Sequence, residues 1–176
     1  DDDEFNEVKT DFRGNPAYST MISKLCEYNR RSEFILKVLS DMLKTNANQQ
    51  IMILAHNKNV LKYLHDAIKH RNIASVGYYV GGMKESALKE TESKKLVIAT
   101  YSMAAEALDI KSLTTLIMAT PKTDIEQIVG RILRAKHPIT SPVIYDIKDS
   151  HEVFEKQWNK RKSFYKKNNY KIIETD

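Results

Sequence analysis

The chain has 176 residues and a hydrophobic fraction of 41%, which suits one folded domain and excludes a fully disordered protein. Its single cysteine, Cys26, excludes a disulfide scaffold, and we expect it to be a core residue in a reducing, intracellular compartment. The net charge of +5 favours an anionic partner such as nucleic acid. No apolar run is long enough to cross a bilayer, so no membrane partner is expected.

The order of elements along the chain predicts the fold class. Residues 1–16 read as an irregular lead-in that ends in a Gly-Asn-Pro turn, and residues 17–176 read as one domain. Apolar runs and strand-like patterns predict strands at residues 51–55, 76–80, 96–100, 116–120 and 143–147. Helical spacing predicts two helices within residues 18–44, one after Asn57, and others at about 84–91, 124–135 and 151–167. This alternation predicts an α/β fold with a mostly parallel sheet flanked by helices.

Polar or glycine residues end or directly follow four of the predicted strands. They are His56, Gly81, Gly82, Thr100 and Thr120. In a parallel α/β sheet, ligands bind outside the carboxyl ends of the strands, so these residues should gather along one edge. Because polar and glycine residues commonly end strands, each one alone also has an ordinary structural explanation.

The predicted helix at residues 124–135 carries the most informative pattern. Gln127, Arg131 and Arg134 fall within a stripe about 60° wide, and the apolar residues lie on the opposite side. Gly130 leaves the backbone bare beside that stripe. Guanidinium groups match phosphate oxygens, so the stripe favours a phosphate-rich ligand, with an ordinary solvated face as the alternative.

Four segments resemble the motifs of one family. They are residues 51–56 (motif IV), 79–82 (the turn after the next strand), 97–110 (motif V) and 127–134 (motif VI). Over roughly residues 30–150 the chain is therefore similar to the second, C-terminal RecA-like domain of superfamily 2 helicases. Within that group it most resembles the UvsW-like phage helicases and the poxvirus-type helicases of large DNA viruses. Ala107 departs from the family, which commonly has glycine there.

The resemblance implies a shared role in ATP hydrolysis. ATP would lie between this domain and the N-terminal RecA-like domain of the same parent chain, which would hold Mg²⁺ and connect through residues 1–16. The residues implied as ATP contacts are Glu106, Asp109, Gln127, Gly130, Arg131 and Arg134. Gln127 and the two arginines would be catalytic, the arginines as arginine fingers. Since the chain has no G-x-x-x-x-G-K-[ST] phosphate loop, the isolated fragment is expected to be inactive.

The resemblance also implies a nucleic-acid track, with DNA favoured over RNA. The implied contacts at the strand ends are Thr100, His56, Asn57, Gly81 and Gly82. The basic helix at residues 151–167 would add Lys160, Arg161 and neighbouring lysines to that surface, with lysines that only face water as the alternative. Its aromatic residues are expected to pack against the sheet, with base stacking as the alternative.

Three interpretations of the function are open at this point. The first is the C-terminal motor domain of an ATP-dependent DNA or RNA helicase or translocase, expected to be monomeric. The second is a non-catalytic nucleic-acid-binding module on the same fold. The third, a protein-interaction domain, leaves the arginine stripe unexplained. If the protein is viral, the host cytoplasm or the virion is its expected location.

Overall fold

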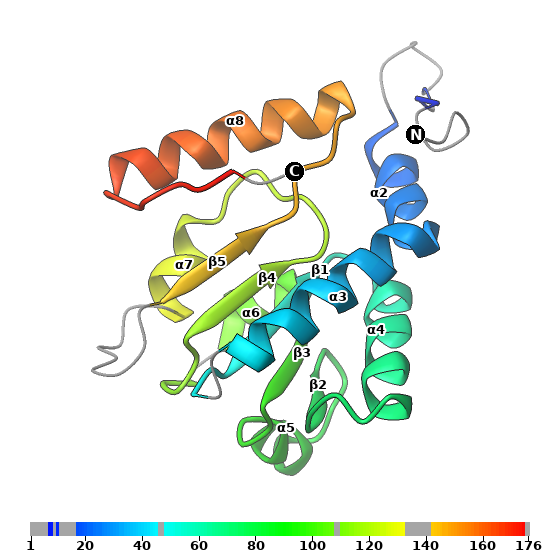
Figure 1. Ribbon diagram of the computed structural model, residues 1–176, viewed down its shortest axis with the longest axis vertical. Helices are drawn as coiled ribbons and strands as arrows, with labels where there is room; N and C mark the ends of the chain where they lie inside the picture. Colours follow the sequence, from blue (N-terminus) through cyan, green and yellow to red (C-terminus); the bar gives the residue numbers. More distant parts are fainter. Residues whose placement is uncertain are drawn as a thin grey trace.

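The computed structural model describes residues 7, 8, 10, 17–45, 48–107, 110–132 and 142–174. Strands and helices alternate along this part of the chain (Figure 1). The strands are β1 (Ile51–Ala55), β2 (Val76–Tyr79), β3 (Leu96–Thr100), β4 (Thr115–Met118) and β5 (Val143–Asp146). The helices are α2 (Tyr18–Glu27), α3 (Asn29–Thr45), α4 (Lys58–His70), α5 (Glu85–Thr91), α6 (Tyr101–Ala107), α7 (Glu126–Ile132) and α8 (Glu152–Lys167). The predicted α/β fold is confirmed.

The five strands form one sheet in the order β2-β3-β1-β4-β5, and every neighbouring pair is parallel. All residues of β1 and β3 are buried. Because helices cover both faces of such a sheet, its inner strands are apolar at every position instead of alternating with polar residues. This burial explains the continuous apolar runs in the sequence.

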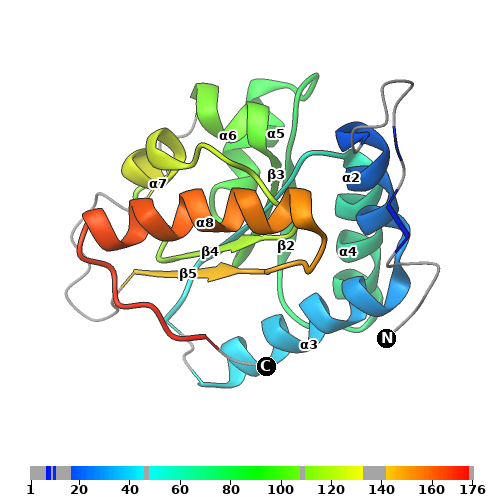
Figure 2. The same ribbon diagram turned by 90° about the horizontal axis from the view of Figure 1, so that it is seen from above.

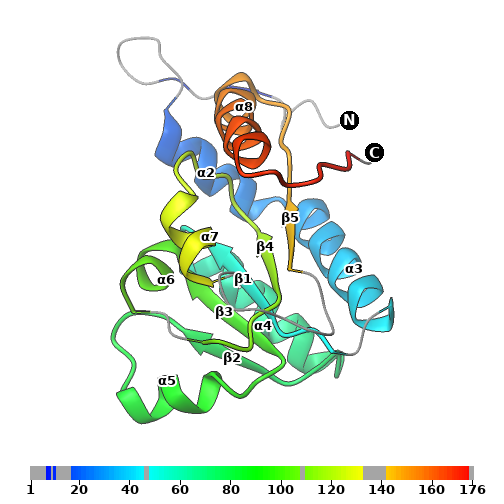
Figure 3. The same cartoon turned by 90° about the vertical axis from the view of Figure 1, so that its left-hand side faces the viewer.

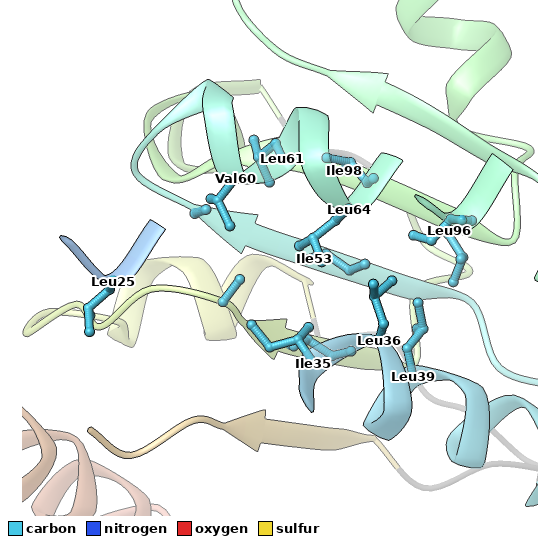
Figure 4. Close-up of a cluster of buried hydrophobic side chains, with 14 of the residues drawn as sticks. Leu25, Ile35, Leu36, Leu39, Ile53, Val60, Leu61, Leu64, Leu96 and Ile98 are labelled. Carbon is cyan, nitrogen blue, oxygen red and sulfur yellow. The ribbon is translucent and has the colours of Figure 1, made fainter. Parts of the chain in front are cut away.

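Helices pack on both faces of the sheet. Figure 2 shows α3 and α4 on one side and α6 and α7 on the other. Alternate residues of β1 supply the two cores: Ile51 and Ile53 belong to the cluster with α3 and α4, and Met52 and Leu54 to the cluster with α6 and α7. Figure 4 shows Leu36, Ile53 and Leu64 of the first cluster pointing toward one another from α3, β1 and α4.

The last helix, α8, closes the fold beside β4 and β5. Phe154 joins the first core, and Trp158 and Tyr165 join the second. The prediction that these aromatic residues pack inward is therefore confirmed. Among the described residues, no helix is both long and apolar enough to cross a membrane.

The sequence did not predict α6, which begins directly after β3. This helix includes the alanine that departs from the family pattern. Ala107 is the last residue of α6, where a helical backbone suits alanine and no positive φ is required.

Candidate nucleotide and nucleic-acid site

The sheet register brings the predicted edge residues together. β1 lies between β3 and β4, with Ala55 opposite Thr100. The residues directly after these strands, His56 and Tyr101, continue this contact, since their ring centroids lie 4.8 Å apart. On the other side, His56 is hydrogen-bonded to Thr120, two residues beyond the end of β4. Three strand ends therefore meet at one place.

His56 is bonded to Thr120 through both its backbone and its ring. Its backbone N–H donates to Thr120 Oγ1 at 3.0 Å, and its Nδ1 lies 2.8 Å from the same oxygen. Burial, with a smaller effect of the Lys122 charge, lowers the pKa of His56 from 6.5 to about 4. A neutral ring lets Nδ1 accept the Thr120 hydroxyl hydrogen. At neutral pH, therefore, His56 brings no positive charge to a phosphate.

Thr100, predicted to touch a phosphate, is only 7% exposed. Its hydroxyl accepts the Met103 N–H at 3.4 Å and lies 3.3 Å from Ser102 Oγ, so it helps to begin α6. This placement gives no support to a phosphate contact from the Thr100 hydroxyl.

The turn after β2 is open. Gly81 and Gly82 are exposed, and a Cβ placed on either glycine would have no neighbouring atom within 4 Å. Gly82 has a φ of 85°, in the left-handed region that favours glycine. Asn57 lies just before α4, as predicted, but its side chain makes no capping hydrogen bond.

The described part of α7 has one buried face and one exposed face. Ile125, directly before α7, and Ile128 and Val129 within it are each 2% exposed, whereas Gln127 and Gly130 lie on the surface. The predicted division of this helix into two faces is confirmed for these residues.

Several residues of the predicted site lie outside the part of the chain that the structure describes. Asp109 and Arg134 lie outside the described residues, as do the side chains of Cys26, Glu106 and Arg131. The backbones of Glu106 and Arg131 belong to α6 and α7, respectively. Most of the lead-in at residues 1–16 also lies outside.

Arg161 does not belong to the surface that the sequence predicted. Its side chain is 1% exposed and pairs with Asp146, with Nε–Oδ2 and Nη2–Oδ1 distances of 2.7 and 2.8 Å. It also donates to the carbonyl oxygen of Lys122 at 2.9 Å. A buried guanidinium with these partners is not accessible to nucleic acid, so the prediction for Arg161 is wrong. Its neighbour Lys160 is exposed, as are Lys166 and Lys167.

The sequence matches the helicase conserved C-terminal domain over residues 34–136, more than half of the chain. The chain belongs to this helicase C-terminal domain family. The resemblance inferred from the four motif-like segments is thereby confirmed.

Viral proteins are among the relatives of this helicase C-terminal domain. It is 36% identical over 160 residues to the Acanthamoeba polyphaga mimivirus protein named "Putative ATP-dependent RNA helicase L396"; the match covers 89% of this chain and 30% of the relative. The African swine fever virus protein QP509L, whose name is of the same kind, is 28% identical over 137 residues, which cover 73% of this chain and 27% of the relative. The chain thus spans about a third or less of these relatives.

Solved structures share the fold of this helicase C-terminal domain. The crystal structure of T4 UvsW matches with a TM-score of 0.71 and 19% identity, over 96% of this chain and 38% of that one. The C-terminal domain of the DEAD-box protein Dbp5 matches with a TM-score of 0.58 and 16% identity, over 75% and 77% of the two chains.

Sequence reasoning missed the buried polar contacts around this edge. Two arginine–aspartate pairs, Arg31 with Asp149 and Arg161 with Asp146, are buried beside it. The partners are 118 and 15 residues apart in the sequence, so no local spacing predicts them. Only the position of Tyr101, directly after a predicted strand, indicated that it lies at this edge.

Proposed function

We propose that this helicase C-terminal domain is one half of a nucleic-acid-dependent ATPase motor, and that α7 faces the ATP bound to the other half. The division of α7 into two faces carries the proposal. Three apolar side chains anchor it to the core, while Gln127 and Gly130 stay on the surface. A glycine on the exposed face allows another domain or a ligand to approach the backbone closely.

The family motifs supply the roles of the individual residues. Arg131 and Arg134 are the arginine fingers, because planar guanidinium groups match phosphate oxygens, and Gln127 contacts the nucleotide. Asp109 hydrogen-bonds the ribose or the motif V network, with Glu106 as a polar support. ATP, bound with Mg²⁺ in the N-terminal RecA-like domain, supplies the phosphoryl group. The arginines of this chain stabilise the negative charge that develops as that group is transferred.

Nucleic acid crosses the same edge of the sheet at the strand ends after β1 and β2. The open turn at Gly81 and Gly82 lets a sugar-phosphate chain approach the backbone, which reads no base sequence. Asn57 and the neutral ring of His56 lie after β1, which β3 separates from β2 in the sheet. Lys160 extends the basic surface along α8. Two viral relatives are named as RNA helicases, so the proposal covers single-stranded RNA as well as DNA.

The test is ATP hydrolysis by the full-length parent protein, stimulated by single-stranded DNA or RNA. Arg131→Ala should lower the rate about a hundredfold or more while nucleic-acid affinity stays nearly unchanged, because an arginine finger acts on the transition state. Arg71→Ala is the matched control, since Arg71 is an exposed arginine on α4's end that pairs with Glu33. Equal rates in wild type and Arg131→Ala would overturn the proposal and leave a non-catalytic binding module.

A further inference from the structure

The segment between β4 and α7 has four consecutive backbone carbonyls that each accept a hydrogen bond from a different helix. The donors are Arg31 of α3 to Ala119, Tyr101 of α6 to Thr120, Tyr18 of α2 to Pro121, and Arg161 of α8 to Lys122. The last three donor–acceptor distances are 2.6, 3.3 and 2.9 Å. In Figure 3 this segment, drawn in yellow-green, passes between α2 and α8 on its way to α7.

Side chains of the segment are held as well. Thr120 Oγ1 is bonded to both the backbone and the ring of His56, at the end of β1. The next hydroxyl, on Thr123, accepts from Gln157 Nε2 of α8 at 2.9 Å. Elements from both faces of the sheet therefore fix residues 119–123.

Two of the four donors are buried guanidinium groups that are also ion-paired. Arg31 Nε lies 2.8 Å from Asp149, and Arg161 Nε lies 2.7 Å from Asp146. Both aspartates lie at or just after the end of β5. Since the desolvation of two charges offsets most of their attraction, such pairs add little net stability. Two of them on one short segment fit a requirement for geometry better than a requirement for stability.

The segment leads into α7. Ile125 follows it within three residues, and its carbonyl accepts the first described hydrogen bond of α7, from Val129 N–H at 2.9 Å. Burial raises the pKa of Tyr101 above its ordinary value of 10.0, so its hydroxyl remains a donor. A shift of the segment would move the exposed face of α7 with it.

We propose that Tyr101 and Arg161 are positioning residues for ATP hydrolysis: they hold residues 119–122 so that α7 presents its exposed face to the nucleotide. This inference rests on the proposed function, because it takes α7 as the helix that faces ATP. It adds residues that touch neither ATP nor nucleic acid and act through the carbonyls of one segment.

The test removes one hydroxyl from the full-length protein with Tyr101→Phe. We expect kcat of nucleic-acid-stimulated ATP hydrolysis to fall about ten- to a hundredfold, because small displacements of catalytic groups have effects of that size. The KM for ATP and the nucleic-acid affinity should stay nearly unchanged. The matched control is Tyr63→Phe on α4. It removes a hydroxyl that donates to Glu33 Oε1 at 2.7 Å. A kcat loss equal to that of Tyr63→Phe would overturn the inference.

A double-mutant comparison separates this inference from the proposed function. If Tyr101 acts through α7, Tyr101→Phe should cause little further loss of rate in an Arg131→Ala background. Fully additive losses would overturn the positioning role while leaving the arginine finger in place. If Arg131→Ala alone keeps the wild-type rate, the proposed function fails and the positioning role fails with it.

Tyr18→Phe provides a second variant that leaves the core intact, because Tyr18 is 36% exposed. Its hydroxyl makes the longest of the measured carbonyl bonds, at 3.3 Å, so its loss of kcat should be in the same direction but smaller. A loss of affinity for nucleic acid instead of a loss of kcat would contradict the positioning role.

Discussion

Two loops at the same edge of the sheet are built in opposite ways. Each backbone carbonyl of residues 119–122, after β4, accepts a hydrogen bond from a side chain, and each of these side chains belongs to a different helix. The turn at Gly81 and Gly82, after β2, is exposed and has no neighbour near the position of a Cβ. The first leads into α7, and the second leads into the short helix α5.

Under the proposed function, this difference follows the demands of two ligands, ATP and nucleic acid. A group that stabilises a transition state must be held in place before the reaction, which requires fixed backbone. A track for a sugar-phosphate chain needs open backbone that many sequences can cross. Under the proposed function, one edge of the sheet would combine a rigid part for catalysis with an accessible part for nucleic acid.

Asp146→Ala should break the rigid part most severely. It leaves Arg161 buried without its carboxylate and removes the acceptor of the Tyr165 hydroxyl, at 2.7 Å. Leaving one charge of a buried pair unpaired costs about 3–5 kcal/mol. Urea unfolding of the chain measures this loss, with Glu33→Ala as the control, since Glu33 forms an exposed pair with Arg71. If both variants lose the same small amount, the buried pair does not hold the segment.

Gly82→Ala tests the backbone of the open turn. At a φ of 85°, alanine should reduce the free energy of unfolding by about 1 kcal/mol, because its Cβ meets the carbonyl in the left-handed region. Gly81→Ala is the control: its φ lies outside that region and its Cβ would meet nothing. Unfolding midpoints in urea compare the two, and equal stabilities would contradict the strained geometry of Gly82.

His56 joins the two parts of the edge, and its titration reports how tightly it is held. Its pKa of about 4 lies below 6.5, so the unfolded chain binds more protons between these values. Stability from this group is thus complete above pH 6.5 and is lost as pH falls through about 4. An NMR titration of the His56 ring should give a midpoint near 4. A midpoint near 6.5 would show that the ring is solvated and not held by Thr120.

Lys160→Ala should have the smallest effect. Removing one phosphate contact weakens binding to single-stranded DNA or RNA of any sequence and lowers the slope of log affinity against log salt by about 1. Lys44→Ala removes the same charge from the far end of α3, where the slope should not change. Affinities measured over a range of salt concentrations decide this, and equal slopes for the two variants would remove Lys160 from the track.

Local patterns predicted the fold and the two faces of α7. Continuous apolar runs reveal buried parallel strands, and the spacing of Ile125, Ile128 and Val129 reveals the inner face of one helix. Those patterns could not show that Arg161 is buried, because its partner Asp146 lies on a different element. From sequence alone, a basic residue in a basic helix reads as surface. The contacts to residues 119–122 were equally hidden, since they join four helices that are distant in sequence.

The most direct test of the account compares Arg131→Ala with Gly81→Ala in the full-length protein. ATP hydrolysis at saturating nucleic acid and the affinity for nucleic acid are measured for both variants. We predict opposite outcomes. Arg131→Ala lowers kcat about a hundredfold and keeps the affinity, whereas Gly81→Ala lowers the affinity about tenfold, because its Cβ hinders the close approach of a sugar-phosphate chain, and keeps kcat at saturation. The same pattern of loss in both variants would contradict the division of this edge into a catalytic part and a nucleic-acid track.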